Sequence, residues 1–76
     1  MKKEDIINII KDALMVDNIT IESSVDNVEE WDSLGHLSIL VELDKEFDGR
    51  LASISDLATA DSVEKIILTL ENKNFI

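Results

Sequence analysis

Apolar residues recur at helical spacing in three stretches of the chain. In residues 3–14 acidic side chains occupy the first turn, where the helix dipole favours anions. Apolar residues follow at intervals of three and four: Ile6, Ile9, Ile10, Ala13 and Leu14. We predict a first helix over this stretch.

The second stretch begins after Asp32, a residue type that often caps helix N-termini. The pattern predicts a helix from Ser33 to about Phe47, with an apolar stripe of Leu34, Leu37, Leu40, Val41, Leu43 and Phe47. Gly49 is expected to end it in a left-handed conformation.

The third stretch, residues 63 to about 72, repeats Val63, Ile66, Ile67 and Leu70. Asp61 and Glu64 are spaced as in a capping box. We expect a short helix near residues 56–58, capped by Ser53 or Ser55, and a loose apolar tail, Phe75 and Ile76.

Residues 15–32 show no sustained period and predict a long loop. Its scattered apolar residues could each pin it to a core: Val16, Ile19, Ile21, Val25, Val28 and Trp31. Ile19 and Ile21 alternate as in a strand, but we expect no partner strand. The prediction is a single all-α domain over residues 1–76. It is a small four-helix bundle with three principal helices, a short third helix and a long loop between the first two.

Composition narrows the possible functions. With 76 residues the chain is too small for a deep substrate pocket, so we expect no enzyme. A formal net charge of -10 disfavours nucleic acid and favours partners with basic patches. No cysteine is present, which excludes disulfides and thiolate metal sites. The chain has no signal peptide or apolar run of spanning length, so we expect a cytoplasmic location.

Ser33, at the expected start of the second helix, allows four interpretations. It could help to cap the helix, act as a nucleophile with His36, or lie beside a metal site. That metal site would use Asp32, His36 and Glu29 or Glu30, and we expect no specific metal. It could also be a covalent attachment point, with a phosphate at the positive end of the helix. Gly35 would keep the first turn slim for a modifying enzyme.

The stretch WDSLGHLSILVELDKEFD, residues 31–48, with the short turn and Asp-Ser-Val helix after it, resembles an acyl carrier protein. The similarity covers nearly the whole chain. It implies 4'-phosphopantetheine on Ser33, an Asp32 that assists the transferase through its metal ion, and a Leu34 between core and partner surface. The thiol of the arm would carry acyl groups as thioesters for fatty acid, polyketide or related biosynthesis. Members of the family also shelter the acyl chain, here in a slot of Leu37, Val41, Leu43, Leu57, Ala58 and Ile66.

The second helix is the recognition helix of that family. The resemblance implies a phosphopantetheinyl transferase and acyl-loading and acyl-transferring enzymes as partners, which would dock through Leu34, Glu42, Asp44, Glu46 and Asp48. Gly35-His36, Ser38 and Lys45 depart from the acidic pattern of fatty acid carriers and favour a specialised pathway. The alternatives are an aminoacyl or peptidyl carrier, against which the aspartate before Ser33 argues, and an unmodified acidic interaction module. We expect a monomer.

Overall fold

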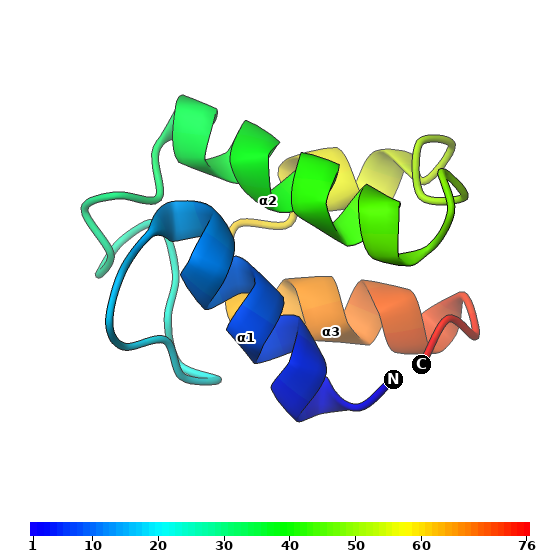
Figure 1. Ribbon diagram of the computed structural model, residues 1–76, viewed down its shortest axis with the longest axis horizontal. Coiled ribbons are helices and arrows are strands. Elements are labelled where there is room, and N and C mark those ends of the chain that lie inside the picture. The colour runs from blue at the N-terminus through cyan, green and yellow to red at the C-terminus, as the bar shows by residue number, and fades with distance from the viewer.

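The computed structural model describes all 76 residues and contains helices without strands (Figure 1). In chain order these are α1 (Lys3–Leu14), α2 (Ser33–Glu46), the 3-10 helix η1 (Ser55–Thr59) and α3 (Val63–Asn72). The all-α prediction is confirmed, but the count of four is not, because the short third helix is one five-residue 3-10 turn. None of these helices has the length and apolar content needed to span a bilayer.

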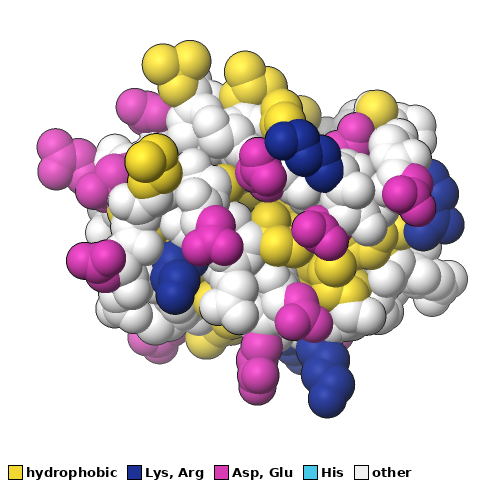
Figure 2. Space-filling view, in the orientation of Figure 1, with side chains coloured by type: hydrophobic (Ala, Val, Ile, Leu, Met, Phe, Trp, Pro, Cys, Tyr) yellow, Lys and Arg dark blue, Asp and Glu magenta, His cyan; other side chains and the backbone are white.

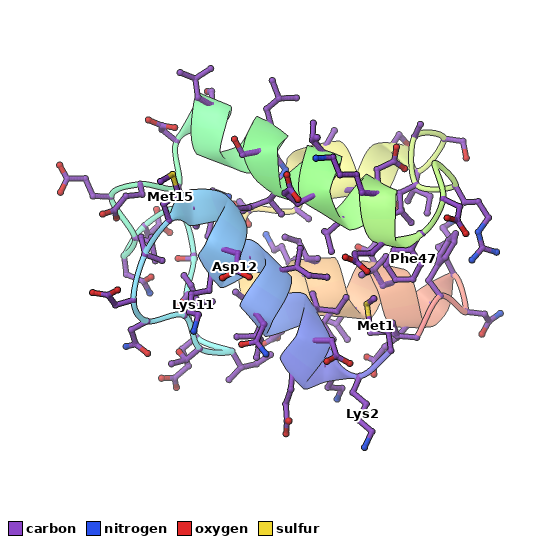
Figure 3. All side chains as sticks on the ribbon, viewed as in Figure 1. Met1, Lys2, Lys11, Asp12, Met15 and Phe47 are labelled. Atoms are coloured by element: carbon purple, nitrogen blue, oxygen red, sulfur yellow. The ribbon has the colours of Figure 1, made fainter.

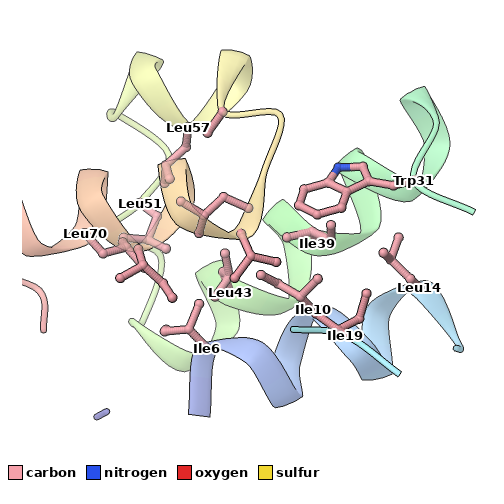
Figure 4. Packing of buried hydrophobic residues seen from close by; sticks show 14 of the residues in the cluster. Ile6, Ile10, Leu14, Ile19, Trp31, Ile39, Leu43, Leu51, Leu57 and Leu70 are labelled. Atoms are coloured by element: carbon pink, nitrogen blue, oxygen red, sulfur yellow. The ribbon is translucent and has the colours of Figure 1, made fainter. Parts of the chain in front are cut away.

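One apolar core joins the three helices (Figure 4). Each contributes residues from one face: Ile6, Ile10 and Leu14 from α1, Ile39 and Leu43 from α2, and Val63, Ile66, Ile67 and Leu70 from α3. Burial of this kind contributes about 1.5–3 kcal/mol for each large side chain. The core therefore fixes how the helices are oriented, and with them the start of α2.

The predicted stripe on α2 is partly wrong. Leu43 and Phe47 are buried, but Leu34, Leu37 and Val41 are 75%, 57% and 47% exposed. Ile39, outside the predicted stripe, is fully buried. The helix carries apolar residues on two sides, and packing against α1 selects the side of Ile39.

The loop of residues 15–32 is held by more than apolar contacts. Ile19 and Trp31 are buried, whereas Ile21 and Val25 remain exposed. As expected, Ile19 and Ile21 have no partner strand, but residues 23–25 of the loop pair with the backbone at the start of α3. The amide of Val25 donates to the carbonyl of Asp61 (3.0 Å) and the amide of Val63 to that of Ser23 (3.0 Å). These bonds draw the loop and the start of α3 together.

Two predicted details of the helix ends are wrong. The side chain of Ser62, not Asp61, caps α3 by accepting from the amide of Lys65 (3.1 Å). No side chain caps η1, whose N-cap is Ile54, so neither Ser53 nor Ser55 has the predicted role.

The C-terminal tail is packed rather than loose. The ring of Phe75 meets that of Phe47, at the end of α2 (Figure 3), edge to face with 5.4 Å between centroids. The guanidinium of Arg50 lies over the ring of Phe75, 5.3 Å from its centroid. The tail therefore fastens the end of α3 to the end of α2.

Candidate functional site: the start of α2

Ser33 is the first residue of α2 and is exposed. The cap is supplied by its neighbour, as predicted: Asp32 Oδ1 accepts from the amide of Gly35 (2.8 Å). No side-chain hydrogen bond within the chain involves the Ser33 hydroxyl. The hydroxyl therefore has no capping role.

Ser62 provides an internal comparison, because it also follows an aspartate at the start of a helix. Its hydroxyl caps α3, its backbone pairs with Ser24, and it is half-buried. The same short motif thus has a structural serine at α3 and an unengaged one at α2.

Gly35 faces the interior of the molecule rather than an approaching enzyme. A Cβ there would overlap the carbonyl oxygen of Glu30 and lie 2.9 Å from Leu14 Cδ2. The expected role in slimming the outer surface is therefore wrong. Glycine is needed because α2, the loop and α1 meet closely at this point.

His36 is engaged at both ring nitrogens. The indole N–H of Trp31 donates to its Nδ1 (3.0 Å), and its Nε2 lies 2.9 Å from the carbonyl oxygen of Leu57 in η1. Neither nitrogen is free to take a proton from Ser33 or to bind a metal beside Asp32. No group of three or more potential metal-binding side chains occurs in the structure. This geometry opposes the nucleophile and metal interpretations of the site.

A groove of about 480 Å³ adjoins Ser33. One side comprises Trp31, Asp32, Ser33 and His36, and the other comprises Ala58, Thr59, Ala60 and Asp61, with Val25 at its edge. The hydroxyl therefore lies beside a concave surface made by two distant parts of the chain.

A second cavity, of about 280 Å³, lies between α2 and the segment leading into η1 and is mainly apolar. Of the expected slot residues, Val41, Leu57 and Ala58 line it. Leu43 and Ile66 instead belong to the closed core, and Leu37 points outward. The cavity thus combines some of the expected residues with others that were not predicted, including Leu40, Leu51, Ala52 and Ile54.

The expected docking residues do not share one face. Leu34 is exposed close to Ser33, and Figure 2 shows apolar side chains along the edge of the molecule formed by α2. Glu42 is paired with Lys45 (3.2 Å), and Asp44 Oδ1 accepts from the amide of Leu51 (3.0 Å). Glu46 and Asp48 are exposed at the far end of the helix. Near Ser33, the outer surface of α2 is therefore apolar rather than acidic.

The sequence did not identify the groove wall opposite Ser33. The backbone of Asp61 is held there by the amide of Val25, which donates to its carbonyl (3.0 Å). Its side chain pairs with Lys65 (2.9 Å), and this hydrogen bond and charge lower the pKa of Asp61 below its usual range. Leu57 is separated from His36 by 21 positions, so no local pattern indicated their contact. The contact between Trp31 and His36 joins residues only five positions apart, so it is the one part of this arrangement that lies within a short stretch of the sequence.

Comparison of the chain with protein-family models, with curated proteins and with solved structures finds no match in any of the three. Function must therefore be inferred from the residues of the site.

Proposed function

We propose that this chain is an acyl carrier that bears 4'-phosphopantetheine on Ser33 and delivers thioester-bound acyl groups to partner enzymes. The observation that carries the proposal is the exposed hydroxyl of Ser33, which has no structural role at the start of α2. The resemblance of the Asp32-Ser33-Leu34 segment to the family motif supports the same residue.

The surroundings of Ser33 suit a phosphodiester. The first bond of the helix runs from the amide of His36 to the carbonyl of Asp32 (2.8 Å), so the amides of Ser33 and Leu34 precede the helical ladder. Free amides at the positive end of a 14-residue helix favour a bound phosphate. The groove beside Ser33 offers the rest of the arm a surface to lie on.

Attachment would use the serine as a nucleophile toward coenzyme A. Ser33 Oγ would form a new bond to the phosphorus nearest the pantetheine, adenosine 3',5'-bisphosphate would leave, and the transferase would take the hydroxyl proton. Asp32, which is exposed, has one carboxylate oxygen engaged by Gly35. In this proposal its other oxygen assists through the metal ion of the transferase.

Two surfaces would serve the loaded carrier. The apolar cavity between α2 and η1 would shelter a short acyl chain. The exposed side chains of Leu34, Leu37 and Val41 would meet partner enzymes near the arm, while Glu46 and Asp48 would face their basic patches.

The proposal is tested by intact mass after incubation with coenzyme A and a broad-specificity phosphopantetheinyl transferase. We expect a gain of one phosphopantetheine, which Ser33→Ala abolishes. Ser33→Ala should remain folded, because Ser33 is exposed and alanine is a good helix former.

Ser62→Ala is the matched control. It should still be modified, although loss of the cap should lower the free energy of unfolding by about 1 kcal/mol. A gain that is lost with Ser62 and kept with Ser33→Ala would overturn the assignment. No gain at all would favour the unmodified interaction module, for which the exposed apolar side of α2 is the supporting feature.

A further inference from the structure

One side chain of α2 is hydrogen-bonded to η1. The bond between His36 and the Leu57 carbonyl is the only hydrogen bond that joins η1 to another helix. Leu57 is itself buried, and the residues after it, Ala58 and Thr59, form the groove wall opposite Ser33.

Hydrogen-bond chemistry fixes the form of the His36 ring. An indole nitrogen can only donate, so Nδ1 of His36 must accept from Trp31 and carries no proton. A carbonyl oxygen can only accept, so Nε2 must carry the proton that is donated to Leu57. The bridge from Trp31 through His36 to Leu57 therefore requires a neutral ring with its proton on Nε2.

Protonation of the ring conflicts with this bridge. In the cation both nitrogens are donors, and the new N–H on Nδ1 would point at the N–H of Trp31 across 3.0 Å. Trp31 is 2% exposed and is held in the core, so the imidazolium ring must move rather than the indole. The bond to Leu57 would then be lost or lengthened.

We infer that His36 is a positioning residue whose neutral ring holds η1 against the start of α2, and that protonation releases this wall of the groove beside Ser33. The inference rests on the bonds of His36 and does not require Ser33 to carry a prosthetic group.

Other charges around the groove are few. Asp32 faces it from the start of α2, and Asp61 faces it from the segment before α3, where Lys65 is its partner. η1 contributes no charged side chain to the groove. Both of these side chains are carboxylates, and no lysine or arginine lines the groove.

The experiment is nuclear magnetic resonance of the unmodified, isotope-labelled chain from about pH 8 to about pH 5, where histidines change charge. The chain has one histidine and one tryptophan, so each ring signal can be assigned to its residue without further experiments. At high pH the ring nitrogen shifts should show the proton on Nε2. As these shifts report the cation, the protection factor of the Trp31 indole proton, which corrects its exchange rate for the pH-dependent intrinsic rate, should fall roughly fivefold to tenfold, the factor for loss of one ordinary hydrogen bond. The amide signals of Ala58 and Thr59 should move in the same titration.

Two variants distinguish the effect of His36 protonation from other effects of low pH on the fold. His36→Gln keeps a donor and an acceptor but cannot gain a proton, so the amides of Ala58 and Thr59 should stop responding. Trp31→Phe removes the opposing N–H together with part of the buried ring, so the cation can keep its bond to Leu57 and the response of η1 should largely disappear. Unchanged far-ultraviolet circular dichroism would show that both variants remain folded.

Three results would overturn the inference. The first is a neutral ring with its proton on Nδ1. The second is a set of η1 amides that stay unchanged while His36 becomes charged. The third is a folded Trp31→Phe variant whose η1 amides respond as strongly as those of the unaltered chain. Asp61→Asn should leave the response in place, because the lowered pKa of Asp61 keeps it ionised throughout this range.

Discussion

At the scale of single residues, neighbours in the segment around Ser33 have separate tasks. Asp32 caps the helix, Ser33 is left exposed and unbonded, and Gly35 permits close packing. His36 then reaches across to η1. The hydroxyl of Ser33 can stay exposed here because Asp32 supplies the cap of the helix.

Gly35→Ala tests whether a glycine is required for the close packing at the start of α2. An alanine Cβ would overlap a backbone oxygen, that of Glu30, which cannot move aside as a flexible side chain could. We expect the free energy of unfolding in urea to fall by about 1–3 kcal/mol, the range for overpacking. This loss should outweigh the gain of about 1 kcal/mol that alanine offers in a helix.

Ser38→Ala is the control, since Ser38 is an exposed residue of the same helix. It should change stability by less than about 0.5 kcal/mol. If Gly35→Ala proved as stable as the unaltered chain, the close approach of α2 to the loop would be disproved.

At the scale of elements, the sequence predicted each helix for a physical reason. The periods of α1 and α3, the cap at Asp32 and the left-handed Gly49 (φ 79°) are local properties, and local patterns report them. The buried side of α2 was not predictable in this way. Helical spacing is equally compatible with burial of two sides of α2, one with Leu34, Leu37 and Val41 and the other with Ile39 and Leu43. Only the packing of α1 decides which side is buried.

In the candidate site, too, local features could be predicted from the sequence and long-range contacts could not. The exposure of Ser33 was expected from its place after a long loop and is confirmed, whereas its attachment chemistry came only from the family resemblance and stays a prediction. The second bond of His36 and the pairing of Ser24 with Ser62 join positions far apart in the chain, and no periodic pattern encodes such contacts. The wall of the groove therefore became visible only in three dimensions.

The C-terminal tail gives a prediction at this scale. Phe75 is half-buried, meets Phe47 edge to face and lies under Arg50. Phe75→Ala should lower the free energy of unfolding by about 1–2 kcal/mol through lost burial and aromatic contact. Phe75→Leu should lose less, because it keeps most of the buried area. Urea denaturation measures both changes.

Leu68→Ala is a suitable control, because Leu68 is 47% exposed on the neighbouring α3. Its effect should be within about 0.5 kcal/mol. A Phe75→Ala variant as stable as this control would mean that the tail contributes nothing to the fold.

At the scale of the whole molecule, the charge is unbalanced. The chain carries 17 acidic and 7 basic residues within a radius of gyration of 11.0 Å. The structure contains three ion pairs, all between exposed side chains, where water screens the attraction and leaves little net stabilisation. Most carboxylates therefore repel one another at distances comparable with the Debye length of about 10 Å at 0.1 M salt.

This imbalance predicts that salt stabilises the fold. Screening weakens the repulsion more in the compact state than in the unfolded chain, whose charges lie further apart. From about 0.01 M to about 0.15 M sodium chloride, the free energy of unfolding should rise by on the order of 1 kcal/mol, the scale of a few like-charge contacts in water. Urea denaturation at each salt concentration measures the change.

The loop before α2 supplies a charge-reduced comparison. Glu29 and Glu30 are exposed, and neither takes part in an ion pair. Replacing both by glutamine should raise stability at low salt and reduce the response to salt, because less repulsion remains to be screened. Choline chloride should act like sodium chloride if the effect is screening. A stabilisation specific to one cation, or equal in the double variant and the unaltered chain, would instead indicate ion binding elsewhere on the surface.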